Sequence, residues 1–210
     1  MVAPLELVCV RHGTTALNTA RIFQGQGNDP ALSPIGEAQV SHLAAHLRSE
    51  HFDFAVSSDL VRAAQTAAGL CPGVVFDRDW REFDFGAWEG LTWEQIRARY
   101  SEQAAAFARN VREVEPPGGE TFEDVVVRVK RALARIVDAL PQGGRALIVT
   151  HTGPLHALRH VLLRNAADDF RAHFSPAGVT RYRVEGERVD LLCLDDHSHL
   201  PEDIDDSLAR

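Results

Sequence analysis

Short apolar runs recur along the chain and alternate with longer amphipathic segments. The first run, residues 5–10, is rich in β-branched side chains, which predicts a strand buried on both faces. Further short strands are expected at residues 54–56, 73–76 and 146–149. The last two apolar runs, residues 179–184 and 189–194, are joined by a Glu-Gly-Glu turn and predict a hairpin.

Helical periodicity fills the intervals between these strands. Ser33 and Pro34 predict a helix start, as N-cap and first helical residue, and apolar residues follow at helical spacing as far as Leu47. Thr121 opens the longest helix, with Asp124 three residues later in an approximate capping box. Helices are also expected at residues 60–70, with residues 57–59 capping it, at 92–109, and from the His151 region to about 163.

The alternation of strands and helices predicts an α/β fold, a three-layer α/β/α sandwich. Its sheet should be mostly parallel, with the final hairpin adding an antiparallel edge strand. We expect residues 1–210 to form a single domain, with a small helical cap insert at about 83–120 and an acidic, mobile tail at 196–210.

Composition narrows the classes of function. The 210 residues are 45% hydrophobic and 25% charged, an ordinary globular balance, and the formal net charge of -8 argues against nucleic acid as a partner. The three cysteines show no close pairing, which argues against a disulfide framework. No apolar stretch approaches the about 20 residues that cross a bilayer, and no signal peptide is recognisable. We therefore expect a cytoplasmic protein without a membrane partner.

Reactive side chains follow three of the predicted strands. Arg11 and His12 end the first strand, Arg62 lies just after the second, and His151 ends the strand at 146–149. The carboxyl ends of parallel strands share one edge of a sheet, so these groups should meet in one cleft. Their mutual repulsion in a dry site would be costly, and a bound phosphate dianion offsets it. The sequence thus predicts a phosphate site with His12 as nucleophile.

Each of these residues, considered alone, could have a purely structural role. A strand-end histidine is often only a satisfied structural group, and most arginines are exposed. It is the joint pattern that favours function. Metal binding is the other alternative, because His42/His46 and His156/His160 have helical i, i+4 spacing. Neither pair has a cysteine or carboxylate at ligand spacing, so we expect no metal and no cofactor.

Five segments together resemble the signatures of the histidine phosphatase superfamily, also called phosphoglycerate mutase-like. The first contains Arg11-His12-Gly13, and the third contains Glu82 in an aromatic setting. The full set is residues 11–18, 57–67, 81–90, 117–121 and 149–153. They occur in the family's order and cover nearly the whole chain.

The resemblance assigns roles to these residues. It implies that His12 forms a phosphohistidine, and that Arg11, Arg62 and His151 surround the transferred phosphoryl group. Glu82 is implied as the proton donor, with Glu89 and Asp84 as rivals and an ion pair from Glu82 to Arg81 or Arg78 as the competing interpretation. Further phosphate-binding positions are Asn18, Gln24, Gly25 and Thr152.

The expected activity is hydrolysis of small phosphorylated metabolites by a histidine acid phosphatase-type phosphomonoesterase. Phe83-Asp84-Phe85-Gly86 after the glutamate resembles the phosphatase branch. Phosphoglycerate mutase activity is the first alternative, and a non-catalytic phospho-ligand sensor is the second. The identity of the substrate is open, as is the oligomeric state, with a homodimer as one option. Four aromatic residues suit either a leaving-group pocket or a core: Phe23, Phe83, Trp88 and Trp93.

Overall fold

One six-stranded sheet forms the centre of the computed structural model, which describes residues 3–163 and 172–204. The strand order is β3-β2-β4-β1-β5-β6. The first four strands in that order are parallel, while β5 runs antiparallel to β1 and β6 antiparallel to β5. Their bounds are β1 Leu5–Arg11, β2 Phe54–Ser57, β3 Val75–Phe76, β4 Gly144–Thr150, β5 Val179–Glu185 and β6 Arg188–Asp196.

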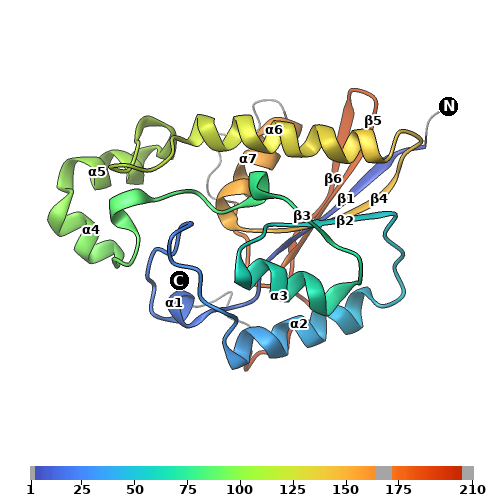
Figure 1. Cartoon of the computed structure of the whole chain (residues 1–210), viewed down its shortest axis with the longest axis horizontal. Coiled ribbons are helices and arrows are strands. Elements are labelled where there is room, and N and C mark those ends of the chain that lie inside the picture. The colour runs from blue at the N-terminus through green and yellow to red at the C-terminus, as the bar shows by residue number, and fades with distance from the viewer. Residues whose placement is uncertain (1–2, 164–171, 205–210) are drawn as a thin grey trace.

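Helices cover both faces of this sheet (Figure 1). Apolar residues of α2 and α3 pack with Val8 and Val10 of β1 on one face, whereas α6 and α7 pack with Leu7 and Cys9 on the other. Successive residues of a strand point to opposite faces, so the apolar run of β1 serves both layers. The longer helices are α2 Pro34–Leu47, α3 Val61–Leu70, α6 Phe122–Ala139 and α7 Thr152–Leu162. The three-layer α/β/α prediction is thus confirmed.

Both predicted helix starts are present. The Ser33 hydroxyl accepts from the Gly36 amide at 3.1 Å, with Pro34 as the first residue of α2. Thr121 and Asp124 form a full capping box at the start of α6. Such caps satisfy amides that have no partner inside the helix. The cap predicted for α3 is wrong, because Leu60 stands at its N-cap and makes no side-chain cap bond.

The segment between β3 and α6 forms the cap at one end of the molecule (Figure 1). Its apolar cluster centres on the buried residues Trp88, Ile96, Ala104 and Val114. The single helix expected at 92–109 is wrong, because the helix breaks at Tyr100, whose ψ of 49° leaves the helical region. The elements after β3 are η1 Arg78–Trp80, η2 Gly86–Trp88, α4 Trp93–Arg99, α5 Ser101–Arg109 and η3 Val111–Glu113.

At the sheet edge opposite β3, the final hairpin and the residues after it differ in part from the sequence prediction. The hairpin adds two strands, of which β5 is the antiparallel one beside β1 and β6 is the edge. Residues 197–204 then pack back on the body: Leu200 is buried, and the Gln39 side chain donates to the Ile204 carbonyl at 2.8 Å. The expected mobile tail is therefore wrong for 197–204, while residues 205–210 lie outside the described residues.

Within residues 3–163 and 172–204, no helix combines the length and the apolar character needed to cross a bilayer.

Candidate active site

His12 lies just beyond β1 with its imidazole buried. Its ring Nδ1 is 2.8 Å from the Gly13 carbonyl oxygen, which can only accept, so Nδ1 carries the proton and donates. The pKa of His12 lies well below its ordinary 6.5, because burial disfavours the charged ring and the guanidiniums of Arg62 and Arg11 repel it. The imidazole is therefore neutral at pH 7, and its Nε2 holds a lone pair.

His151 lies at the end of β4 and is the N-cap residue of α7. Its ring centroid is 5.0 Å from that of His12, and its Nε2 is 2.9 Å from the Ser58 hydroxyl oxygen. Burial first, and then the charge of Arg62, hold the pKa of His151 well below 6.5. The two imidazoles thus meet at one sheet edge, as parallel strands predict.

Arg62 is the most buried cation of the group, with no exposed surface. Its Nη2 donates to the Gly25 carbonyl at 2.8 Å, and its Nη1 donates to Asp29 Oδ1 at 3.2 Å. Its Nε is buried without a hydrogen-bond partner among the described residues. The loop after α1 (Ala16–Thr19) therefore fixes the guanidinium beside both imidazoles.

Arg11 is the last residue of β1, directly before His12, and is partly buried. Its Nη1 donates to the Phe174 carbonyl at 2.7 Å, which joins the end of β1 to the segment before β5. Its charge contributes to the lowered pKa values of both His12 and His151. The four groups expected in one cleft are thus brought together.

The remaining predicted phosphate positions shape the same edge. Asn18 Oδ1 accepts from the Thr15 amide at 3.0 Å, which caps α1, and Gln24 Oε1 is 3.0 Å from the Thr15 hydroxyl. Gly25 offers its carbonyl to Arg62, and Thr152 begins α7 directly after His151. These contacts organise the loop; a role in binding phosphate stays a prediction for all four residues.

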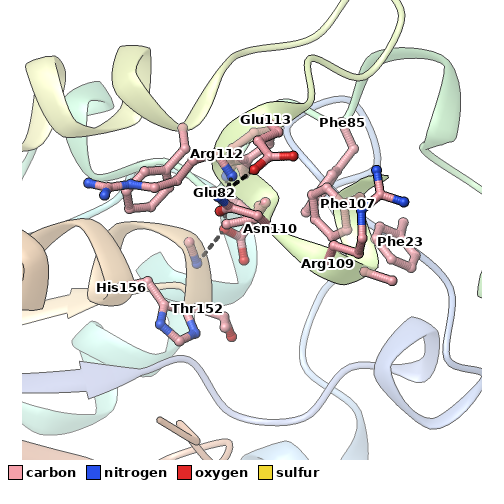
Figure 2. A pocket seen from close by; sticks show the side chains of 15 residues that line it. Phe23, Glu82, Phe85, Phe107, Arg109, Asn110, Arg112, Glu113, Thr152 and His156 are labelled. Atoms are coloured by element: carbon pink, nitrogen blue, oxygen red, sulfur yellow. Dashed lines mark hydrogen bonds between the residues drawn. The ribbon is translucent and has the colours of Figure 1, made fainter. Parts of the chain in front are cut away.

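Glu82 lies between the imidazoles' edge of the sheet and the cap. Its Oε1 accepts from the amide of Phe83 at 2.8 Å and from the amide of Gly153, in α7, at 2.9 Å (Figure 2). The first turn of α7 and the backbone next to Glu82 thus fix the same carboxylate oxygen. The competing interpretation, an ion pair with Arg81 or Arg78, is wrong, because both arginines pair with Asp59.

The two rival carboxylates have structural partners. Glu89 accepts from the amides of Gln26 and Gly27, each at 2.8 Å, and burial raises its pKa. Asp84 Oδ1 accepts from the Gly86 amide at 2.9 Å, inside its own turn. Both contacts organise loops, whereas the Glu82 carboxylate accepts from the amide of Gly153, two residues after His151.

Sequence reasoning missed a buried clamp behind Glu82. The guanidinium of Arg128 in α6 donates to three backbone carbonyls, those of Asp79 at 2.9 Å, Arg81 at 2.6 Å and Glu82 at 3.0 Å. Two of its nitrogens also donate to the Glu120 carboxylate, at 2.9 and 3.0 Å. These bonds fix the backbone that presents the Glu82 side chain. A charged residue on the apolar stripe of α6 was the only sequence signal for this clamp.

A cavity of about 1100 Å³ opens beside Glu82 (Figure 2). Phe23 and Phe83 line it, whereas Trp88 and Trp93 pack in the core of the cap. All four aromatic residues pack in or against an apolar cluster, and two of them also line the cavity. Their role as a leaving-group pocket stays a prediction. The lining also includes Thr152, Gly153 and His156 from α7 and the residues 107–113 from the cap.

The paired histidines of the sequence make other contacts. The His46 ring stacks on His199 at 5.0 Å, and His160 lies 2.8 Å from an Arg112 nitrogen. The ring of His156 meets Phe174 edge-on at 4.9 Å. In the part of the chain that the structure describes, no three histidine, cysteine or carboxylate side chains gather as a metal site.

The chain is similar to known proteins along most of its length. The family model of the histidine phosphatase superfamily (branch 1) matches residues 7–197. The chain is 39% identical over 187 residues to the bifunctional protein Rv2228c of Mycobacterium tuberculosis, which covers 84% of this chain and 50% of that protein. It is 36% identical over 160 residues to a metal-independent phosphoserine phosphatase of Arabidopsis thaliana, covering 73% and 66%. The solved structure of a mycobacterial glucosyl-3-phosphoglycerate phosphatase superposes with a TM-score of 0.81 at 31% identity, covering 91% and 98%.

The chain therefore belongs to the histidine phosphatase superfamily, whose fold is phosphoglycerate mutase-like. Its relatives include phosphatases and 2,3-bisphosphoglycerate-dependent phosphoglycerate mutases. The chain spans about half the length of the mycobacterial proteins that it matches at 39% identity.

Replacing the clamp residue should cost stability. In Arg128→Met, Glu120 and three carbonyls lose their buried partner, and we expect the free energy of unfolding in urea to fall by about 3–5 kcal/mol. Arg131→Met, an exposed arginine on the same helix, is the matched control and should change it little. Equal losses in the two variants would show that the clamp adds nothing.

The buried imidazoles should make stability depend on pH. Their pKa is 6.5 in an ordinary setting and lower in the folded state, so the unfolded chain binds more protons once the pH falls below 6.5. The free energy of unfolding should then decrease below pH 6.5, by at most about 1.4 kcal/mol per pH unit for each ring. Urea titrations from about pH 7.5 to about pH 5 should show a shallower slope for His12→Gln than for the exposed His42→Gln. Identical slopes would contradict a buried neutral His12.

Proposed function

We propose that the chain hydrolyses phosphomonoesters through a covalent phosphohistidine on His12. The observation that carries this proposal is the state of its imidazole: neutral, with Nδ1 fixed on the Gly13 carbonyl and Nε2 left with its lone pair, within the electrostatic influence of the buried Arg62 and the partly buried Arg11. A nucleophilic nitrogen needs that protonation state, and a phosphoryl group needs those cations.

In the first step, Nε2 of His12 attacks phosphorus and the bond from phosphorus to the ester oxygen breaks. Arg11, Arg62 and His151 stabilise the negative charge on the equatorial oxygens, which offsets the repulsion among these groups in the free enzyme. Glu82 gives its proton to the leaving oxygen. Its anchored Oε1 sets the direction of the carboxyl group, and the clamp behind it limits the motion of its backbone.

In the second step, water attacks the phosphorus of the phosphohistidine. Glu82, now a carboxylate, takes a proton from that water, and His12 leaves as the neutral imidazole with which the cycle began. The step releases inorganic phosphate. The roles of these residues need neither a metal nor an organic cofactor, and the partner is a small-molecule phosphomonoester.

Loss of the nucleophile should abolish turnover. We expect His12→Ala to lower kcat on p-nitrophenyl phosphate by at least roughly a thousandfold, because the variant lacks the nitrogen on which the proposed covalent intermediate forms. His42→Ala, an exposed histidine of α2, is the matched control. Full activity in His12→Ala would overturn the mechanism, whereas a wild type that binds phosphate without any turnover would favour a phospho-ligand sensor.

The proton donor can be tested by the acidity of the leaving group. Glu82→Gln should lose about 10²- to 10⁴-fold in kcat on an alkyl phosphate, whose alkoxide needs a proton. On p-nitrophenyl phosphate, whose phenolate leaves unaided, the loss should be small. Equal losses on both substrates would remove Glu82 as the acid.

The second candidate function is that of a mutase, in which the phosphoryl group returns from the enzyme to the substrate, because some relatives are phosphoglycerate mutases. Incubation with 3-phosphoglycerate separates the two activities, with inorganic phosphate and 2-phosphoglycerate measured together. We expect phosphate without isomerisation. Isomerisation faster than phosphate release would identify a mutase.

A further inference from the structure

The cavity beside Glu82 lies where the leaving group of a phosphomonoester must go. Thr152 and Gly153 directly follow His151, and the Gly153 amide holds the Glu82 carboxylate that borders the cavity. An ester oxygen placed between phosphorus on His12 and the acid Glu82 therefore directs the rest of its alcohol into this space. This argument rests on the proposed function, since it takes Glu82 as the acid.

One wall of the cavity is aromatic and firmly supported. Phe23, Phe85 and Phe107 come from three separate segments, and Phe85 meets Phe23 at 4.9 Å and Phe107 at 6.4 Å, both edge to face. Trp93 supports this wall from the cap, stacked on Phe23 at 6.1 Å. Phe23, Phe85 and Phe107 are all only partly buried, so the free enzyme keeps apolar ring surface toward the cavity. A flat apolar group would cover that surface.

Arg109, at the end of α5, is one of the two arginines that line the cavity. It lines the cavity on the same side as Phe23 and Phe107 (Figure 2). The side chain is exposed, and it forms no ion pair with any residue in the described ranges. The other arginine of the lining, Arg112, is engaged with His160 and lies over the Phe122 ring at 5.4 Å. Arg109 is thus the cation placed to meet an acidic group on a ligand.

The size of the cavity also argues for a large leaving group. About 1100 Å³ exceeds the roughly 300–1,000 Å³ that is usual for small-molecule pockets. A three-carbon acid such as glycerate would leave most of it, and all of the aromatic wall, in contact with water.

We propose that the cavity selects phosphomonoesters whose alcohol has a flat apolar body carrying a negative charge, with the body against Phe23, Phe85 and Phe107 and the charge at Arg109. The substrate class is then aromatic or similarly flat acidic alcohols, phosphorylated on a hydroxyl that reaches Glu82. Small polar phosphates such as phosphoglycerate are poor members of this class.

A substrate series on the unmodified enzyme tests the apolar part. Ethyl phosphate, benzyl phosphate and 4-carboxybenzyl phosphate all release primary alcohols, so they make similar demands on the acid. We expect kcat/KM to rise about 10- to 100-fold from ethyl to benzyl phosphate, as burial of a phenyl ring predicts. We expect a further rise of about two- to fivefold for the 4-carboxy compound, the range of a half-exposed ion pair.

Two variants test the assigned residues. Arg109→Gln should bring the ratio of kcat/KM for 4-carboxybenzyl to benzyl phosphate down to about one, whereas Arg99→Gln, another exposed cap arginine outside the lining, should keep the wild-type ratio. Phe23→Leu should lower the ratio of benzyl to ethyl phosphate, and it retains an apolar side chain to support folding. An unchanged carboxylate ratio in Arg109→Gln would overturn its role.

The outcomes separate this inference from the activity on which it rests. Equal kcat/KM for ethyl and benzyl phosphate, with p-nitrophenyl phosphate hydrolysed normally, would overturn the inference and leave the hydrolase standing. No phosphate release from any ester, p-nitrophenyl phosphate included, would overturn both. The order ethyl, benzyl, 4-carboxybenzyl in rising kcat/KM would support it.

Discussion

The buried guanidinium of Arg62 is the group on which the site depends. It has no exposed surface, its nitrogens hold the loop carbonyl of Gly25 and the carboxylate of Asp29, and it lowers the pKa of both imidazoles. A buried cation beside two neutral bases is an unfavourable arrangement for an empty site. In the proposed mechanism, a phosphate dianion offsets this unfavourable charge when it binds.

The proposed acid comes from a different part of the chain than the proposed nucleophile. His12 and the cations lie at the sheet edge, while Glu82 belongs to the segment after β3 that continues into the cap. Two sets of bonds join this segment to the site: the Gly153 amide holds the carboxylate, and Arg128 with Glu120 holds the backbone. The cap then adds the aromatic wall, so we propose that attack, protonation and leaving-group selection come from neighbouring but separate parts of the fold.

Local sequence rules predicted the features that depend on a few adjacent residues. The strand at 5–10 and the helix starts at Ser33 and Thr121 follow from apolar runs and capping side chains. The meeting of His12, Arg62 and His151 followed from one topological rule, that parallel strands end at the same edge. The resemblance to a known family supplied Glu82.

Features that depend on distant partners were missed. Residues 57–59 suited a helix cap in sequence, but Ser58 instead contacts His151 and Asp59 pairs with Arg81. The clamp of Arg128 joins α6 to a segment 46–49 residues away, which periodicity cannot reveal. The break at Tyr100 and the packing of residues 197–204 likewise depend on tertiary contacts that override local preference.

The central claim is that His12 carries the phosphoryl group during turnover. The most direct measurement is to quench the enzyme in alkali during hydrolysis of a phosphomonoester and locate bound phosphate by peptide mass spectrometry. The account predicts an acid-labile phosphoryl group on the peptide that contains His12, absent when the experiment is repeated with His12→Gln. A phosphoryl group on the peptide that contains His151, and none on the peptide that contains His12, would contradict it.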